Sequence, residues 1–247
     1  MAREASTLAM SYYGNAKSWD KEDATPVTEA DLAIDQFIQK EIAKNFPQDA
    51  CLSEEAKDNK KRLEQDYVWI IDPIDGTKGF IQENGEFAVM IGLTYKGKTS
   101  FGVVALPASN EIFYGGTNLG IHCQKDDKDI ELPPFNPTGN RVFLSRHHLD
   151  PKVKDFVEKM NYQSLSCGSV GVKVCRILQG KGEHYIHSSN VGEWDTAAPE
   201  ALLKAAGGTF VGQDGKELTY NKIIPKTAGM IASINPHFPT LFLKDFS

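Results

Sequence analysis

This sequence has few cysteines, no long apolar run and no excess of basic residues. The four cysteines, at positions 51, 123, 167 and 175, include no C-x-x-C pair and are too sparse in 247 residues for a disulfide framework. We therefore expect reduced thiols in a cytoplasmic protein. Apolar stretches such as Val68–Ile71 are far shorter than the roughly 20 residues that cross a membrane, and the first residues lack the apolar core of a signal peptide.

The balance of charge is acidic. Lys and Arg number 27 against 33 Asp and Glu, which gives a net charge of −6. General binders of nucleic acid polymers or anionic membranes need a positive surface, so both classes are disfavoured. The 40% hydrophobic and 24% charged residues are typical of a globular chain, and the length allows one large domain or two small ones.

Residue periodicity predicts a first half that mixes helices with antiparallel strands. Residues 3–13 favour a short helix ended by Gly14. Thr28 begins a second helix, since Asp31 follows at capping-box spacing, apolar residues recur at the helical period and Pro47 ends the run. Strands at the spacing of antiparallel hairpins are expected over residues 67–71, 87–95, 100–105 and 111–114.

The second half alternates strands with helices, which favours a mainly parallel sheet. The expected helices cover residues 151–160, 169–179 and 195–206, and the expected strands cover residues 141–144, 163–166, 183–187, 209–211 and 229–234. A Pro-, Gly- and Asn-rich segment at 133–140 is the natural seam. We predict an α+β subdomain over 1–139 and an α/β subdomain over 140–247.

The most informative stretch is residues 69–80, W-I-I-D-P-I-D-G-T-K-G-F. A buried strand runs into Asp72 and Asp75, and carboxylates near a core are costly without a partner. A hard divalent cation with oxygen ligands would satisfy both. Gly76 and Thr77 could begin a helix whose N–H groups face an anion. Taken alone, the motif is also compatible with a plain Asp-Pro turn.

Three further segments add carboxylates. The S-E-E run at 53–55 supplies Glu54, and D-A-T-P-V-T-E-A-D occupies residues 23–31 before the second helix. The W-D-T-A-A-P-E run places Asp195 as the expected N-cap of a helix, and a free oxygen of a cap can also reach a metal. Each segment alone is compatible with a solvated acidic patch or a simple cap.

Together the four motifs resemble the inositol monophosphatase superfamily of Mg²⁺-dependent, lithium-sensitive phosphatases, over about residues 3–235. D-G-T-K-G-F followed by N-G-E-F, with V-K-V-C at 172–175, is most similar to the 3'(2'),5'-bisphosphate nucleotidase branch. The resemblance implies an α/β fold class, built as a layered αβαβα sandwich.

The resemblance also implies two or three Mg²⁺ ions in the active site. Glu54, Asp72 and the backbone carbonyl of Ile74 would hold one ion, and a third, largely hydrated ion would lie near Glu54. Asp72, Asp75 and Asp195 would hold the second. Mg²⁺ prefers octahedral oxygen ligands, and a shared Asp72 would fix the separation of two ions for in-line attack on phosphorus.

The family pattern assigns catalytic roles to Thr77, Asp23 and Glu54. Thr77, polarised by Asp23, would orient or deprotonate the attacking water, with no covalent intermediate. Backbone N–H groups of Gly76 and Thr77 would hold the phosphoryl oxygens.

Substrate contacts rest on weaker matches. Lys173 would pair with the phosphate that is not cleaved, although a solvated lysine is the plain alternative. Ser169 and His147 would contact the substrate, with His148 as a substitute for His147. Val170 stands where some relatives have serine, so the pattern departs from the family here.

The predicted enzyme is a Mg²⁺-dependent phosphomonoesterase, a cytoplasmic monomer or homodimer. It would remove the 3'-phosphate from the small molecule adenosine 3',5'-bisphosphate and leave AMP. Inositol phosphate, histidinol phosphate or a sugar bisphosphate is the alternative substrate within the superfamily. A non-catalytic phosphate or metal sensor is a third possibility, which the complete set of acidic residues and Thr77 disfavours.

Overall fold

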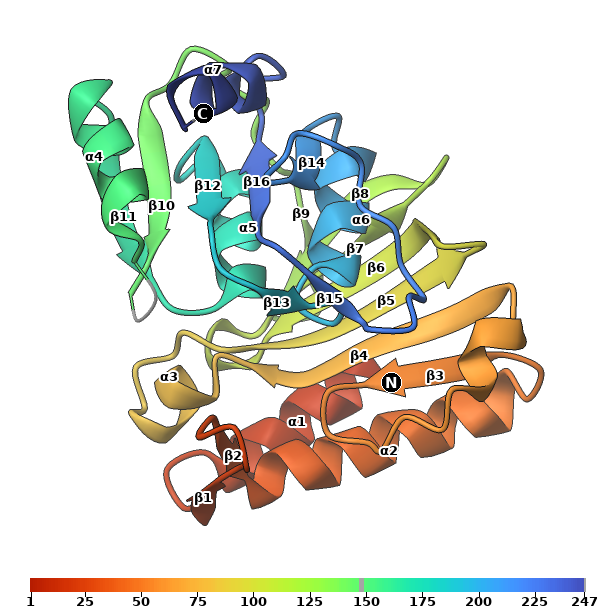
Figure 1. The fold of residues 1–247 in the computed structure, drawn as a ribbon. Helices are drawn as coiled ribbons and strands as arrows, with labels where there is room; N and C mark the ends of the chain where they lie inside the picture. The colour runs from red at the N-terminus through yellow and green to blue at the C-terminus, as the bar shows by residue number, and fades with distance from the viewer. Residues whose placement is uncertain (147–148, 247) are drawn as a thin grey trace.

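Two large β-sheets and two short ribbons organise the chain, which the computed structural model describes over residues 1–146 and 149–246 (Figure 1). The larger sheet has the strand order β3 (Ala50–Ser53), β4 (Tyr67–Asp75), β5 (Ala88–Tyr95), β6 (Lys98–Leu106), β7 (Glu111–Gly116), β8 (Gly120–Lys125) and β9 (Lys128–Ile130). The smaller sheet has the order β11 (Gln163–Cys167), β10 (Arg141–Ser145), β12 (His184–His187), β16 (Met230–Ser233) and β14 (Thr209–Gly212). The ribbons pair β1 (Ser18–Asp20) with β2 (Pro26–Thr28) and β13 (Val191–Gly192) with β15 (Lys226–Thr227).

Helices cover both faces of each large sheet. They are α1 (Ala2–Tyr12), α2 (Glu29–Asn45), α3 (Thr77–Ile81), α4 (Pro151–Lys159), α5 (Val170–Leu178), α6 (Ala197–Ala205) and α7 (Phe238–Phe246), with 3-10 turns at Lys61–Glu64 and Pro107–Ser109. Within the described residues, none of these helices is both long and apolar enough to cross a membrane.

Helix layers and sheet layers alternate, and an apolar cluster fills each interface. The apolar faces of α1 and α2 pack on one face of the larger sheet, where Ile34 and Ile38 meet Ile71 and Val89. Helices α5 and α6 fill the space between the two sheets. Helices α4 and α7 cover the outer face of the smaller sheet. The predicted αβαβα sandwich is confirmed (Figure 1).

The hairpin prediction for the first half is confirmed, because β4 to β7 pair antiparallel in sequence order. The sequence analysis missed β8 and β9. Its expectation of a mainly parallel second sheet holds for β10 with β11 and with β12, but β16 is antiparallel to both β12 and β14. Residues 213–229, which include β15, join β14 to β16 without a helical crossover, and only a parallel pair needs one. The subdomain boundary at residue 139 stays a prediction.

Two small residues let α6 lie close to the larger sheet. Gly92 of β5 and Gly102 of β6 face each other across the strand pair. A Cβ on Gly92 would lie 2.8 Å from the Cβ of Ala197, and one on Gly102 would lie 2.5 Å from the carbonyl oxygen of Ala198. Any larger side chain there would therefore push α6, and Asp195 before it, away from the sheet.

We expect Gly102→Val to destabilise the fold by about 2 kcal/mol or more, because the new side chain meets the backbone of α6. Lys98→Val on the same strand is the matched control. Lys98 is exposed and its ion pair with Glu217 spans 3.7 Å, so its loss should change stability by less than about 0.5 kcal/mol. Urea unfolding of both variants measures the difference, and equal midpoints would contradict this account of α6 packing.

Candidate active site

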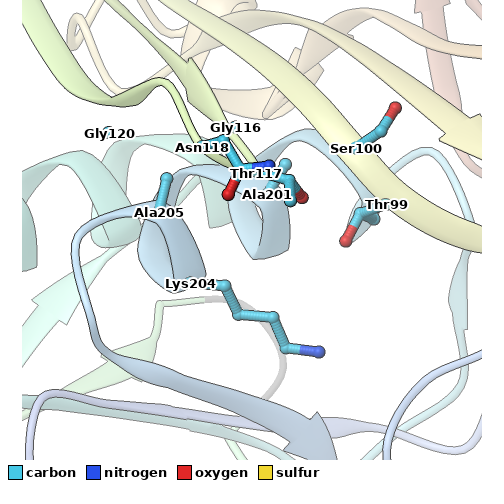
Figure 2. A pocket seen from close by; sticks show the side chains of 9 residues that line it. All are labelled: Thr99, Ser100, Gly116, Thr117, Asn118, Gly120, Ala201, Lys204 and Ala205. Atoms are coloured by element: carbon cyan, nitrogen blue, oxygen red, sulfur yellow. The ribbon is translucent and has the colours of Figure 1, made fainter.

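Two cavities of about 510 Å³ differ in the chemistry of their walls. One lies at the C-terminal end of α6, where short side chains surround it (Figure 2). Lys204 is the one charged group among the described residues that line it, and its ammonium pairs with Glu200. The other cavity is lined by the carboxylates that the sequence analysis selected, which are Glu54, Asp72, Asp75 and Asp195. The second cavity is therefore the candidate active site.

An irregularity in β4 places two carboxylates on the same side of the sheet. Asp72 pairs with Met90 of β5 and Asp75 with Ala88, so three steps on β4 oppose two on β5. In a regular strand, residues three apart face opposite sides. The extra residue in the Pro73–Ile74 stretch reverses that alternation and turns Asp75 toward Asp72. The D-P-I-D sequence thus forms a two-carboxylate site at the end of a core strand.

The parallel pairing of β3 with β4 brings Glu54 to the same edge. Ser53 lies opposite Ile71, and the N–H of Glu54 donates to the carbonyl of Ile71 at 3.2 Å. Burial raises the pKa of Glu54, and the ammonium of Lys21 opposes that rise from 2.8 Å away. Lys21 also lies 2.6 Å from Glu55. The sequence analysis missed Lys21, which neutralises part of this acidic cluster.

Asp195 reaches the site from the turn before α6. It was predicted to be the N-cap of that helix, and this is wrong, because α6 starts at Ala197 with Thr196 as its N-cap. The carboxylate of Asp195 instead accepts the N–H of Gly192 at 2.6 Å. That bond turns the side chain of Asp195 back toward the end of β13 and away from the first N–H groups of α6.

Asp72, Asp75 and Asp195 form a compact group of oxygen donors. One ligand oxygen from each lies within 4.8 Å of the others. Asp72 is 1% exposed, and within the described part of the chain its Oδ1 has no hydrogen-bond partner. Burial and the negative charge of neighbouring carboxylates raise the pKa of Asp72 and of Asp195. These residues fit a hard divalent cation, which supplies the missing partner and offsets the repulsion.

The hydroxyl of Thr77 has a different partner from the predicted one. It lies 3.3 Å from Oδ1 of Asp31 and 3.2 Å from the carbonyl oxygen of Ile74. Asp23 accepts instead from the N–H and the hydroxyl of Thr25, at 3.1 Å and 2.6 Å. The predicted pairing of Asp23 with Thr77 is therefore wrong, because the Asp23 carboxylate closes its own turn at the tip of the β1–β2 ribbon.

Asp31 has two separate roles, one for each carboxylate oxygen. Its Oδ2 accepts the N–H of Thr28 at 2.8 Å and completes the predicted capping box of α2. Its Oδ1 faces Thr77. The capping box was predicted correctly, and because it accounted for Asp31, no second, tertiary partner was predicted for that residue.

The first turn of α5 holds Asp75 from the other side of the site. Ser169 is the N-cap of α5, and its hydroxyl donates to Oδ2 of Asp75. The N–H of Gly171 donates to the same oxygen at 2.6 Å. Burial raises the pKa of Asp75, and these two donors oppose the rise. The hydroxyl of Ser169 thus has a partner in Asp75, and its contact with substrate stays a prediction.

Lys173 lines the cavity as a buried cation. It is 0% exposed, its ammonium donates to the carbonyl of Gly168 at 2.6 Å, and it lies 4.5 Å from the ring centre of Tyr185. Burial lowers the pKa of Lys173 to about 8. The solvated lysine that the sequence also allowed is excluded. A buried ammonium with one neutral acceptor has donors left for an anion in the cavity.

Polar side chains of β10, of β12 and of the loop after β12 form a further wall of the cavity. Nδ1 of His187 lies 3.0 Å from the hydroxyl of Tyr185 and 3.2 Å from that of Ser145. Its Nε2 lies 2.8 Å from the hydroxyl of Ser189. All four residues line the cavity. The predicted substrate contact at His147 lies outside the described residues.

Residues 1–244 match the sequence profile of the inositol monophosphatase family. The 3'(2'),5'-bisphosphate nucleotidase CysQ of Escherichia coli O157:H7 is 34% identical over 231 residues, which are 89% of this chain and 91% of that protein. The crystal structure of CysQ from Bacteroides thetaiotaomicron, a bacterial member of the inositol monophosphatase family, is 29% identical with a TM-score of 0.80 and covers 94% of each chain. An IMPase/NADP phosphatase complexed with Mg²⁺ and phosphate has a TM-score of 0.83 at 20% identity, over 98% of this chain and 90% of its own, and supports the fold alone.

The raised pKa of Asp72 has a consequence for stability without metal. The pKa of Asp72 is higher in the folded than in the unfolded chain, so the folded chain holds this proton more tightly. The stability that the protonated form contributes is present at acid pH and is lost as pH rises through the folded pKa. We expect Asp72→Asn in EDTA to be more stable than the wild type at pH 8, by about 1–3 kcal/mol, and this gain to shrink toward pH 4.

Urea unfolding with EDTA or with Mg²⁺ measures this difference. Mg²⁺ should stabilise the wild type and have much less effect on Asp72→Asn. Asp155→Asn, on the exposed face of α4, is the control and should follow the wild type under all conditions. An Asp72→Asn protein that matches the wild type at both pH values and in its response to Mg²⁺ would contradict a cation at this position.

Proposed function

Because this chain belongs to the inositol monophosphatase family, we propose that it removes the 3'-phosphate from adenosine 3',5'-bisphosphate and leaves AMP and inorganic phosphate. It is a phosphoric monoester hydrolase. The observation that carries this function is the buried group of Asp72, Asp75 and Asp195, with the unpaired Oδ1 of Asp72 within the described residues. The 34% identity to a bisphosphate nucleotidase over most of both chains supports the choice of substrate.

Mg²⁺ is the metal that we propose for the acidic group, as two or three ions. Asp72, Asp75 and Asp195 would hold it, with Glu54 and the carbonyl of Ile74 as further ligands. When bound, Mg²⁺ acidifies water and stabilises negative charge on the phosphoryl and leaving-group oxygens. Lithium should inhibit the enzyme if Li⁺, which carries a smaller charge, replaces one Mg²⁺ in this site.

Thr77 positions the water that attacks phosphorus. Its hydroxyl hydrogen points to an acceptor, Asp31 or the carbonyl of Ile74, so its oxygen is left to accept a hydrogen bond. Thr77 lines the cavity, and a water that donates to this oxygen is oriented and made a better nucleophile. Asp31 thereby acts in place of the Asp23 that the sequence predicted.

The turn that begins α3 supplies donors for the phosphoryl group. The first N–H groups of a helix have no partner within it, and Gly76 and Thr77 lie at that end of α3. Gly76 has φ +92°, and a Cβ there would lie 2.6 Å from the carbonyl oxygen of Glu86. Only glycine therefore allows this turn both its left-handed conformation and its close approach to the backbone of Glu86.

We assign the second phosphate of the substrate to Lys173 and the leaving nucleoside to the wall formed by Ser145, Tyr185, His187 and Ser189. A buried ammonium binds an anion strongly, since little solvent competes for it. We place the reaction in the cytoplasm, as a monomer or a homodimer, and the free thiols of all four cysteines agree with a reducing compartment.

Lys173→Met should weaken the binding of substrates that carry the second phosphate and have little effect on those that lack it. We expect the KM for adenosine 3',5'-bisphosphate to rise about 10- to 100-fold, because a charged hydrogen bond is lost. The KM for adenosine 3'-monophosphate, which lacks the second phosphate, should change less than about twofold. Steady-state phosphate release measures both. Equal increases in KM for the two nucleotides would show that Lys173 does not bind the second phosphate. If the wild type hydrolyses inositol 1-phosphate as fast as adenosine 3',5'-bisphosphate, the nucleotidase assignment is overturned.

The role of Asp31 is testable apart from its capping box. We expect Asp31→Asn to lower kcat by about 100-fold or more, because the charged acceptor for Thr77 is lost. Thr28→Ala is the matched control: it should cost about 1 kcal/mol of stability and leave kcat nearly unchanged. If Asp23→Asn lowers kcat strongly while Asp31→Asn does not, the pairing predicted from sequence is restored and this assignment fails.

A further inference from the structure

Glu86 lies in the N-G-E-F motif, which the proposed chemistry leaves without a role. Its carboxylate accepts two hydrogen bonds from Arg146, at 3.0 Å from Nε to Oε2 and at 2.7 Å from Nη2 to Oε1. It also accepts the N–H of Gly168 at 2.8 Å. A bidentate arginine–carboxylate pair fixes the direction of both groups more firmly than a single contact does. Neither Glu86 nor Arg146 is among the described residues that line the cavity.

The bond from Gly168 to Glu86 fixes the turn that leads into α5. The same glycine accepts from Lys173 through its carbonyl at 2.6 Å, so a charged partner holds each end of this short segment. The next residue, Ser169, donates to Asp75, and so does the N–H of Gly171. The position of this turn therefore decides where the two donors of Asp75 lie.

The backbone of Glu86 contacts the other half of the site. A Cβ on Gly76 would lie 2.6 Å from its carbonyl oxygen, and one on Gly79 would lie 2.5 Å away. Both glycines belong to the D-G-T-K-G-F turn that follows Asp75. Glu86 thus packs its backbone against the turn after Asp75 and directs its side chain to the turn before α5. Arg146 adds a third element, since it directly follows β10 of the smaller sheet.

We propose that Glu86, fixed by Arg146, is a positioning residue that sets the register between Asp75 and the first turn of α5, and so sets the affinity for metal. The proposal rests on the metal site of the proposed function. Asp75 has one oxygen held by α5 and leaves the other for a cation. Outer-shell partners that orient ligands typically change metal affinity about 10- to 100-fold. Glu86 acts on a ligand through two intervening hydrogen bonds, which places its effect at the lower end of that range.

The test compares Glu86→Gln with a matched glutamate elsewhere. Glu111 of β7 also receives an arginine of the second half, Arg176 of α5, at 3.2 Å, and the described lining of the cavity does not include it. Isothermal titration of Mn²⁺ into each substrate-free protein gives the metal dissociation constant directly. We expect about a tenfold increase for Glu86→Gln and less than twofold for Glu111→Gln.

A second variant and a kinetic readout separate positioning from other roles. Arg146→Lys keeps the charge but loses the bidentate fork, and it should weaken Mn²⁺ binding in the same direction. With saturating Mg²⁺, KM for substrate should stay within about twofold in Glu86→Gln, because the residue does not contact substrate. In a double-mutant cycle, Arg146→Ala should weaken binding much less when Glu86 is already alanine.

Three results would overturn the proposal. Unchanged Mn²⁺ affinity in Glu86→Gln would show that Glu86 does not position the metal ligands. An equal loss in Glu111→Gln shows a general loosening of the interface between the sheets. A rise in KM at saturating metal, with normal Mn²⁺ binding, indicates direct contact with substrate. A wild type that binds Mn²⁺ but hydrolyses no phosphomonoester would instead reject the proposed function, and the binding comparison would still decide the role of Glu86.

Discussion

The burial of the Asp72 carboxylate at the end of a core strand is the constraint on which the rest of the site depends. Its Oδ1 is unpaired within the described residues, and burial together with the negative charges of Glu54, Asp75 and Asp195 raises its pKa. Desolvation and repulsion both oppose the ionised form of Asp72, and a bound cation would offset that cost. Three features bring these carboxylates together: the irregularity in β4, the parallel pairing of β3 with β4 and the close packing of α6.

Neutral backbone donors orient two of these carboxylates, those of Asp75 and Asp195. Gly171 and Gly192 each donate an N–H to one oxygen of an aspartate, Asp75 and Asp195 respectively. Such bonds fix orientation without adding a positive charge that would compete with metal. The positive charges lie beside the three aspartates: Lys21 pairs with Glu54 and Glu55, and Lys173 is among the lysines that line the cavity. The site is thus pre-organised for a cation and for an anion beside it.

The sequence could predict features that are set by neighbours along the chain. The capping box of Thr28 and the antiparallel hairpins are local, and they were predicted correctly. The partner of Thr77 was assigned wrongly because it depends on how α2 packs beside α3, which spacing alone does not encode. The direction of the Asp195 carboxylate depends on a bond from the N–H of Gly192, at the end of β13. Strand β9 was missed because all three of its residues are exposed, and β8 because its apolar alternation is limited to Ile121 and Cys123, too short a pattern to mark a strand.

Calorimetric titration of Mg²⁺ into the metal-free protein, repeated in two buffers of different ionisation enthalpy, tests the central claim most directly. Since burial and mutual repulsion raise the pKa of these carboxylates, a bound cation must displace protons from them. We expect saturable binding with net proton release, and loss of both in Asp75→Asn. Binding that releases no protons, or that persists unchanged in Asp75→Asn, would contradict a metal held by this group of carboxylates.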